Sequence, residues 1–382
     1  MKQSVTVNQP AEAKWQKVIK TLFSKVSVKK PSFNLLSTLK KVGIPFASIV
    51  VFIGIWHLGA EGLRQREINY RVEKTLADQG EAAAAALKSC FASGDATCQT
   101  NTLPSPTMVW ASVMTLINDH FIILEDKKAF RDKTASLNEK IKVFNKENAA
   151  LISAGKVAKK ELIEYTGRAS FIDIVLTSLK TVFAGFLLAF FIAVPIGIVI
   201  GLSDKLRNAF NWFIQIFKPV SPVVWYLLVF MIVKTLLIGT STDNSFVISF
   251  ISVGLCAMWA TLVNTAVGVS TVDKDYINVA KVLKLGPLQK VFKVILPSSL
   301  PLIFTGLRIT LSVAWMVLIA IELLAQSPGL GLFVWEEFQN GANDSNSKII
   351  VAMFVIGIIG FLLDRFMLTI QNMVSFNKSE GI

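Results

Sequence analysis

Residues 276–301 read YINVAKVLKLGPLQKVFKVILPSSLP and lie between two long apolar segments. The stretch carries four lysines and no acidic residue, and it closes with an apolar run into Pro297. Ile277, Ala280 and Lys284 recur at the spacing of a short amphipathic helix. We therefore predict that residues 271–300 form a basic, helix-containing loop between two membrane spans.

The overall composition is that of a membrane protein. Of the 382 residues, 53% are hydrophobic and 17% are charged, which is more apolar than one soluble core requires. The formal net charge is +13, but the basic residues sit at the ends of apolar segments and not on a polar surface with interleaved aromatic residues. We therefore expect membrane lipids, and no nucleic acid, as partners of these charges.

Runs of about 20 apolar residues predict membrane-spanning helices. Six such runs indicate an all-α polytopic membrane protein: 42–60, 172–202, 210–239, 246–269, 301–325 and 349–370. The last five belong to a predicted core of residues 171–373.

Basic residues predict the orientation. Residues 1–41 contain nine lysines and one acidic residue, so we expect a cytoplasmic N-terminal segment that is too long for a signal peptide. Apolar residues in this segment recur at helical spacing among the lysines, which suits a helix lying on the inner leaflet; a solvated tail is the alternative. Residues 203–208, the loop 271–300 and the tail 374–382 then fall in the cytoplasm, and residues 325–348 fall outside.

Residues 61–170 interrupt this pattern. They carry 16 basic and 14 acidic residues and, by our interpretation, no spanning run, which predicts an extracytoplasmic insertion after the first helix. Residues 125–165 are rich in Lys, Glu, Ala and Leu and predict one or two exposed helices. Cys90 and Cys98 lie close together outside the cytoplasm and are disulfide candidates, with two free thiols as the alternative.

Two of the predicted spans contain features that shape helices. Small residues four positions apart in the second span predict a stripe for close helix packing: Gly185, Ala189, Ala193, Gly197 and Gly201. Pro195 permits a kink in the same helix. In the third span, Pro219 and Pro222 interrupt the helix just before Trp225, which faces either a partner helix or the transport pathway.

Charged residues within spans are costly and therefore informative. Arg308 and Glu322 are 14 residues apart, about 20 Å along one helix, so they cannot pair with each other. We expect Lys180 or Lys234 to pair with Glu322, and a carboxylate or helix end to meet Arg308. Asp364 and Arg365 are expected to reach the cytoplasm by snorkelling.

Interior cations lower the electrostatic barrier for a small anion. On that basis the candidate pathway residues are Lys180, Trp225, Lys234, Arg308, Trp315 and Glu322. Snorkelling lysines and structural ion pairs are the alternative explanation for each charge taken singly.

Sequence signatures of catalysis are missing. Gly155-Lys156 lacks the rest of a phosphate-binding G-x-x-x-x-G-K-[ST] loop. His57 and His120 are isolated, so we expect no metal site, and there is no nucleophile elbow. We expect a non-enzymatic chain that binds no cofactor, with any ATP and Mg²⁺ bound by partner subunits.

The loop within 271–300 resembles the cytoplasmic loop of ABC importer permeases, whose pattern is EAA, three residues, Gly, nine residues, then an apolar residue and x-Leu-Pro. Ala280, Val294, Leu296 and Pro297 are in register with it. The departures are Asn278 for Glu, Val279 for Ala, and Lys284 for Gly with Gly286 two places later. The resemblance implies these ATPase-coupling residues: Asn278, Val279, Ala280, Lys281, Val282, Leu283, Lys284, Gly286, Leu296 and Pro297.

Three further segments carry the resemblance. Residues 103–113 (LPSPTMVWASV), 177–203 and 305–325 resemble the nitrate, bicarbonate and sulfonate (taurine) permeases of the bacterial inner membrane, nearest to nitrate permeases. In the third segment the matching residues are Gly306, Arg308, Trp315 and Glu322. The resemblance implies a type I ABC importer permease fold with both termini inside.

The same resemblance implies the function and partners. It predicts import of a small oxyanion, nitrate first, with nitrite, cyanate or bicarbonate next and taurine or alkanesulfonates as the alternative. The implied partners are cytosolic ABC ATPase subunits, a second permease copy in a homodimer and an extracytoplasmic substrate-binding protein. A secondary transporter and a membrane receptor or scaffold are the rivals from other classes.

Overall fold

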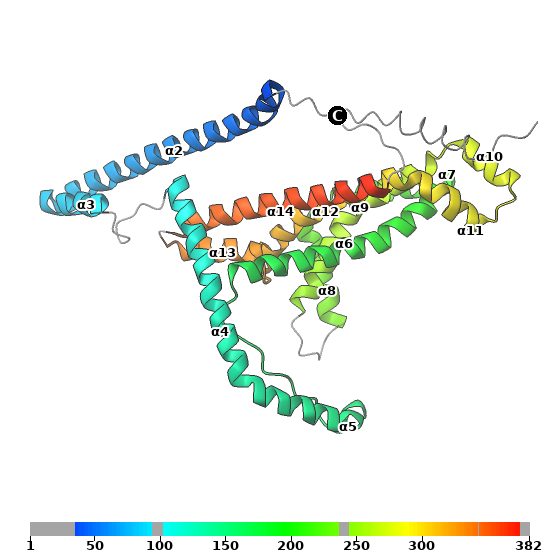
Figure 1. The fold of residues 1–382 in the computed structure, drawn as a ribbon, viewed down its shortest axis with the longest axis horizontal. Coiled ribbons are helices and arrows are strands. Elements are labelled where there is room, and N and C mark those ends of the chain that lie inside the picture. The colour runs from blue at the N-terminus through cyan, green and yellow to red at the C-terminus, as the bar shows by residue number, and fades with distance from the viewer. Residues whose placement is uncertain (1–34, 94–101, 237–243, 343, 375–382) are drawn as a thin grey trace, which may run out of the picture. The chain divides into compact units, whose positions relative to one another are not determined.

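A computed structural model describes residues 35–93, 102–236, 244–342 and 344–374. Every regular element within those ranges is helical, which confirms the all-α class (Figure 1). The predictions for residues 1–34 and for the end of the tail, 375–382, lie outside the described residues.

The chain divides into residues 1–59 and residues 60–382. The described part of the first unit is the beginning of helix α2 (Leu35–Gln79), whose side chains Phe46, Val51 and Ile55 are exposed as expected of a helix in lipid. The predicted first span is therefore helical, and its helix continues well beyond residue 60.

The second unit contains a bundle built on α6 (Phe171–Gly201), α9 (Ser245–Ser270), α12 (Leu296–Ala325) and α14 (Ser345–Val374). The predicted small-residue stripe of α6 faces α9, which confirms its packing role. A β-carbon added at Gly197 would lie 2.7 Å from the Thr265 Cβ, and one at Gly185 would lie 2.9 Å from Val253. Only residues without large side chains allow the two backbones to approach this closely.

A threonine joins α12 to α9 at the centre of the bundle. The Thr310 hydroxyl donates to the Ala257 carbonyl oxygen at 3.1 Å and accepts from the Thr261 N–H at 3.1 Å. The hydroxyl thus bonds to two backbone groups that are one turn apart in α9.

The interruption predicted within the third span is confirmed, and it is a sharp bend between two helices. The described part of this span, residues 210–236, is divided between α7 (Asp204–Phe217) and α8 (Pro222–Leu236), which meet at an angle of 98°. Proline lacks an N–H and restricts the residue before it, so Pro219 and Pro222 end one helix and start the next.

Residues 61–170 contain a helix that our interpretation missed. Helix α4 (Pro106–Glu147) is one of six described helices that are long and apolar enough to cross a membrane, and the α7–α8 pair would make a seventh. The prediction that this segment lacks such a run is therefore wrong. Figure 1 shows α4 running across the α13 end of the bundle, whereas α6 and α14 run along it.

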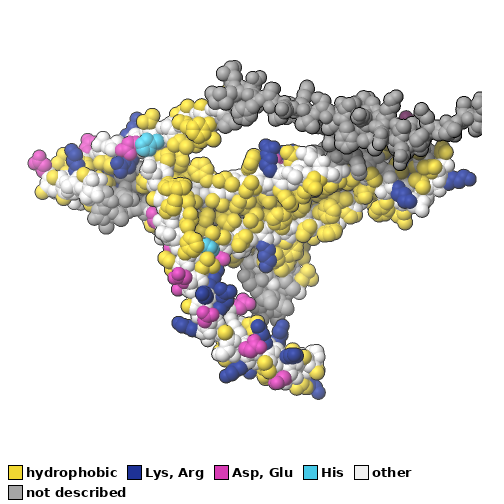
Figure 2. Space-filling model, in the orientation of Figure 1, with side chains coloured by type: hydrophobic (Ala, Val, Ile, Leu, Met, Phe, Trp, Pro, Cys, Tyr) yellow, Lys and Arg dark blue, Asp and Glu magenta, His cyan; other side chains and the backbone are white. Residues whose placement is uncertain are grey.

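The two ends of the bundle differ. Figure 1 shows α7, α10 (Lys274–Val282) and α11 (Pro287–Lys290) at one end and α13 (Leu330–Asn340) at the other. The predicted cytoplasmic loops thus lie at the same end. Figure 2 shows hydrophobic side chains along the flank of the bundle, while charged side chains gather on the second half of α4 and on α5 (Ala149–Ser153).

The second half of α4 and α5 confirm the predicted exposed helices. The chain after α5 returns along α4, where the side chains of two asparagines each form two hydrogen bonds with the backbone of one residue. Asn138 bonds the N–H and carbonyl of Ile163 at 2.8 and 3.1 Å, and Asn145 bonds those of Lys160 at 3.0 and 2.8 Å. These paired hydrogen bonds hold the returning chain against the second half of α4 in a defined conformation.

Candidate functional site

Helix α10 begins and ends with recognisable caps. The Asp273 side chain accepts from the Asp275 N–H at 3.0 Å at its start. At its end Lys284 adopts a left-handed conformation with φ 50°, and the Leu285 N–H reaches the Ala280 carbonyl oxygen at 3.1 Å. This is the C-terminal turn that glycine normally occupies, so the structure explains why the related loops have Gly where this chain has Lys284.

The two faces of α10 have different surroundings. Ala280 is only 1% exposed and Ile277 packs with Val269 and Ile295, so one face lies against the protein itself. The other face is uncovered: three adjacent apolar side chains are exposed, Val279 at 56%, Val282 at 80% and Leu283 at 64%. The predicted helix is confirmed, with Ala280 on its inner side.

The loop continues into a membrane helix without a break. The π-helix η2 (Val291–Ile295) follows α11 directly, and α12 begins at the next residue, Leu296. Pro297 is the second residue of α12 and, having no N–H, donates no backbone bond back into η2. A displacement of α10, which packs on η2, would therefore reach α12 through continuous helix.

Glu322 does not pair with a lysine, contrary to expectation. Lys180 and Lys234 are exposed and lie over the rings of Phe246 and Phe230, at 5.1 and 5.2 Å. A lysine on the bundle surface can place its ammonium in water, whereas reaching the buried carboxylate would require desolvating the charge.

Glu322 is instead held by neutral donors. Its carboxylate is 1% exposed and accepts from the Ser178 hydroxyl at 2.7 Å and from the Gly331 N–H at 2.9 Å. The Leu330 N–H donates to the same Ser178 oxygen at 2.9 Å. A β-carbon at Gly329 would lie 2.1 Å from the carboxylate. Glu322 thus fastens the turn between α12 and α13 to α6.

Arg308 meets a carboxylate, as expected, and that carboxylate is Asp364. The two hydrogen bonds are Nε to Oδ1 at 2.5 Å and Nη2 to Oδ2 at 2.8 Å. The expectation that Asp364 snorkels to the cytoplasm is therefore wrong, because a bidentate ion pair satisfies it within the bundle. Arg365 alone remains exposed, 5.0 Å from the Phe361 ring centre.

The two tryptophans singled out from the sequence have packing contacts. Trp225 lies in an aromatic cluster with Phe217 and Trp259, its ring 6.3 Å from that of Trp259. Trp315 is buried, and its indole N–H donates to the Ile356 carbonyl oxygen at 3.0 Å, which ties α12 to α14. The structure thus brings Trp315 and Arg308 to one helix seam, apart from Glu322.

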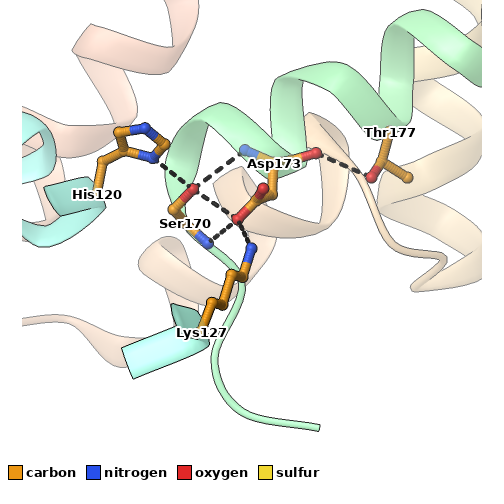
Figure 3. Close-up of polar contacts among 5 residues, drawn as sticks. All are labelled: His120, Lys127, Ser170, Asp173 and Thr177. Atoms are coloured by element: carbon orange, nitrogen blue, oxygen red, sulfur yellow. Dashed lines mark hydrogen bonds and ion pairs between the residues drawn. The ribbon is translucent and has the colours of Figure 1, made fainter. Parts of the chain in front are cut away.

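Sequence analysis missed a polar cluster that joins α4 to the start of α6 (Figure 3). Ser170 caps α6 and donates to Asp173 at 2.6 Å, the His120 Nδ1 lies 2.9 Å from the Ser170 hydroxyl, and Lys127 pairs with Asp173 at 2.6 Å. Beside it lies a cavity of about 390 Å³ lined by residues of α4, α6 and α13. The Ser-x-x-Asp spacing before an apolar run could have predicted the cap.

The disulfide candidate stays a prediction. Cys90 lies near the end of α3 (Glu81–Ser93), and Cys98 lies outside the described residues. Cys256, within α9, is a free, half-buried thiol.

A bent third span, a tight small-residue bundle and a helical loop with an exposed apolar face define a polytopic helical membrane protein. The profile described as "Binding-protein-dependent transport system inner membrane component" matches residues 193–375. The chain belongs to this family of permease subunits and is a multi-pass protein of the bacterial inner membrane. The resemblance noted in the sequence is confirmed.

Relatives within this family indicate which of its branches the chain resembles. The nitrate import permease protein NrtB of Synechococcus elongatus is 36% identical over 201 residues, 53% of this chain and 69% of that protein. The bicarbonate transport system permease protein CmpB of Synechocystis sp. is 36% identical over 52% of this chain and 68% of that protein. The taurine transport system permease protein TauC of Escherichia coli is 30% identical over 54% and 72%.

Among solved structures, an inward-facing MetNI methionine ABC transporter has 18% identity and a TM-score of 0.47, covering 53% of this chain and 95% of that chain.

We expect Lys284→Gly to stabilise the end of α10 by about 1 kcal/mol, because a residue with a β-carbon is strained in the left-handed region. Amide hydrogen exchange of residues 274–285 should slow in the variant. Lys284→Ala is the matched control, since it removes the charge and keeps the β-carbon. Equal protection in both variants would show that the charge, and not the backbone, is responsible.

We expect Glu322→Ala to lower stability by roughly 2–4 kcal/mol, because it leaves the Gly331 N–H and the Ser178 hydroxyl without an acceptor and opens a cavity. Glu322→Gln keeps an acceptor oxygen and should cost clearly less. Thermal unfolding of the purified chain measures both. A Gln variant as unstable as the Ala variant would mean that the negative charge itself is required.

Proposed function

We propose that the chain is the transmembrane permease subunit of an ATP-driven ABC importer, and that α10 couples it to ATPase subunits. The observation that carries this proposal is the exposed group of Val279, Val282 and Leu283 on a basic helix at one end of the bundle. Adjacent exposed aliphatic side chains outside the membrane are typical of a protein contact. Membership of the permease family supports an ATPase as the partner.

In the proposed mechanism α10 lies in a groove of the ATPase. The exposed apolar group enters the groove, and Lys281 and Lys284 lie at its rim. ATP and Mg²⁺ bind to the partner subunits, whose closure pushes two copies of the loop together. Because η2 continues into α12, the push tilts α12 and the helices packed on it, and this gives alternating access.

The proposed cargo is a small oxyanion, with nitrate first and bicarbonate, nitrite and cyanate next. Support comes from the nitrate and bicarbonate permeases, each 36% identical, against 30% for the taurine permease that represents the sulfonate alternative. Arg308, Lys180 and Lys234 are the cations that would favour an anion in the bundle.

The remaining proposed partners are a second permease copy and an extracytoplasmic binding protein. Much of α8 has no cover, with Val224, Met231 and Ile232 exposed, and a second copy would complete the pathway there. The binding protein would approach the end that carries α13 and α4.

Two rivals make different predictions. A secondary transporter would move its cargo on an ion gradient without any ATPase. The function of a receptor or scaffold would depend on residues 61–170. For the proposed importer, transport should survive, at least in part, when residues 62–100 and 120–168 are deleted.

We expect Val282→Asp to release the ATPase subunits, because an aspartate cannot enter an apolar groove without losing its hydration. The measurement is co-purification of the ATPase with the full-length permease. Leu137→Asp changes an exposed aliphatic residue on the second half of α4 and should leave the complex intact. Full co-purification of the Val282 variant would remove α10 from the docking surface.

The complex of permease, ATPase and binding protein, reconstituted in liposomes, should hydrolyse ATP faster when nitrate is supplied outside. Nitrate should give the largest stimulation, bicarbonate less, and taurine little. Stimulation by taurine alone would shift the proposal to the sulfonate branch, and uptake that needs no ATPase would favour the secondary transporter.

A further inference from the structure

The Arg308–Asp364 pair lies within the depth of the membrane. Arg308 is about 18 Å from Leu296 along α12, and Asp364 is about 15 Å from Val374 along α14, at 1.5 Å per residue. Both positions are more than a turn inside apolar helices long enough to cross a bilayer. Measured from the predicted span ends at residues 301 and 370, the pair lies about 10 Å, or two turns, inside each span.

The pair is also open to its surroundings. The side chains of Arg308 and Asp364 are 36% and 25% exposed. Exposure of charged groups to hydrocarbon is strongly unfavourable, so at this depth they must face water or polar protein. On the neighbouring turns Ser312 and Arg365 are exposed, beside exposed apolar side chains such as Met316 and Phe361. The ion pair is thus a polar break in a surface that is otherwise largely apolar.

Other contacts hold this seam together. On one side of the pair the Trp315 indole bonds the Ile356 carbonyl at 3.0 Å. On the other side the Gln371 amide donates to the Thr305 hydroxyl at 3.2 Å and to the Pro301 carbonyl at 3.4 Å. Leu363 and Met367 also anchor α14 in the hydrophobic core. The ion pair can therefore open without separating the two helices.

We propose that Arg308 is a binding site for the transported anion and that Asp364 occupies this site when no anion is present. The carboxylate presents two oxygens to Nε and Nη2 of one guanidinium, the geometry that a planar oxyanion such as nitrate or bicarbonate can also adopt. An arriving anion displaces Asp364 from Arg308, and return of the carboxylate expels the anion. This inference rests on the proposed transport of a small oxyanion.

Because the carboxylate competes with the anion for Arg308, substitutions of Asp364 and of Arg308 should change anion binding in opposite directions. Asp364→Asn removes the competitor and keeps the guanidinium, so binding should tighten by about tenfold, the size of one coupling between neighbouring charges. Arg308→Gln removes the binding group and should abolish binding. Arg308→Lys keeps the charge and loses the planar fork, so it should bind more weakly than the unmodified chain.

The experiment measures the unfolding temperature of the full-length permease in lipid nanodiscs against sodium nitrate, with sodium gluconate holding the ionic strength constant. A ligand that binds the folded state raises this temperature, and the half-saturating nitrate concentration follows. Gln371→Ala is the matched control: it breaks another contact of the same seam, leaves the ion pair in place, and should respond to nitrate as the unmodified chain does.

Equal half-saturating concentrations in the unmodified and Asp364→Asn chains would overturn the proposal, as would a nitrate response that survives in Arg308→Gln. Asp364→Ser is a second neutral variant, and failure of both Asp364 variants to fold would show that the pair is structural. The unfolding measurement needs no ATPase, so the anion site and the importer can fail separately. If nitrate binds Arg308 as proposed but does not stimulate ATP hydrolysis in the reconstituted complex, the importer is rejected and the anion site is retained.

Discussion

The constraint on which this structure depends is that a polar group within a membrane bundle must find its partner in the protein, because hydrocarbon offers none. Glu322 meets Ser178 and the Gly331 N–H, and Thr310 fits into the backbone bonding of α9. Each of these contacts joins two helices. The polar residues therefore specify which helices are neighbours, while the apolar side chains, which pack as well against lipid, do not.

Close packing makes those polar contacts reachable. The stripe of glycine and alanine on α6 brings its backbone against α9, and α12 then lies on α9 closely enough for a short threonine to reach it. The two ends of this bundle differ in structure. At one end α10 exposes an apolar face, and at the other Glu322 fastens the turn before α13. In the proposed mechanism, a push on α10 would act on this closely packed bundle through η2 and α12.

The ion pair between Arg308 and Asp364 differs from the other polar contacts. Glu322 is sealed from solvent, so removing its partners would leave a buried acid unsatisfied. Arg308 and Asp364 are partly exposed and belong to a seam that has independent contacts above and below them. A partly exposed ion pair in a seam with other contacts has room to exchange partners, and this connects the proposed anion site with the proposed function.

The sequence by itself determined the all-α membrane class, the helical loop after residue 271, the packing stripe of α6 and the family, because spacing, hydropathy and motifs are local properties of the chain. It also required a partner for Arg308. Only the tertiary structure decided that the partner is Asp364, 56 positions away, and that Glu322 bonds Ser178 and not a lysine. Pro219 and Pro222 predicted an interruption between α7 and α8, but its angle of 98° and the course of α4 across the bundle are seen only in the structure. Such pairings depend on how helices face one another, which periodicity within a single helix does not encode.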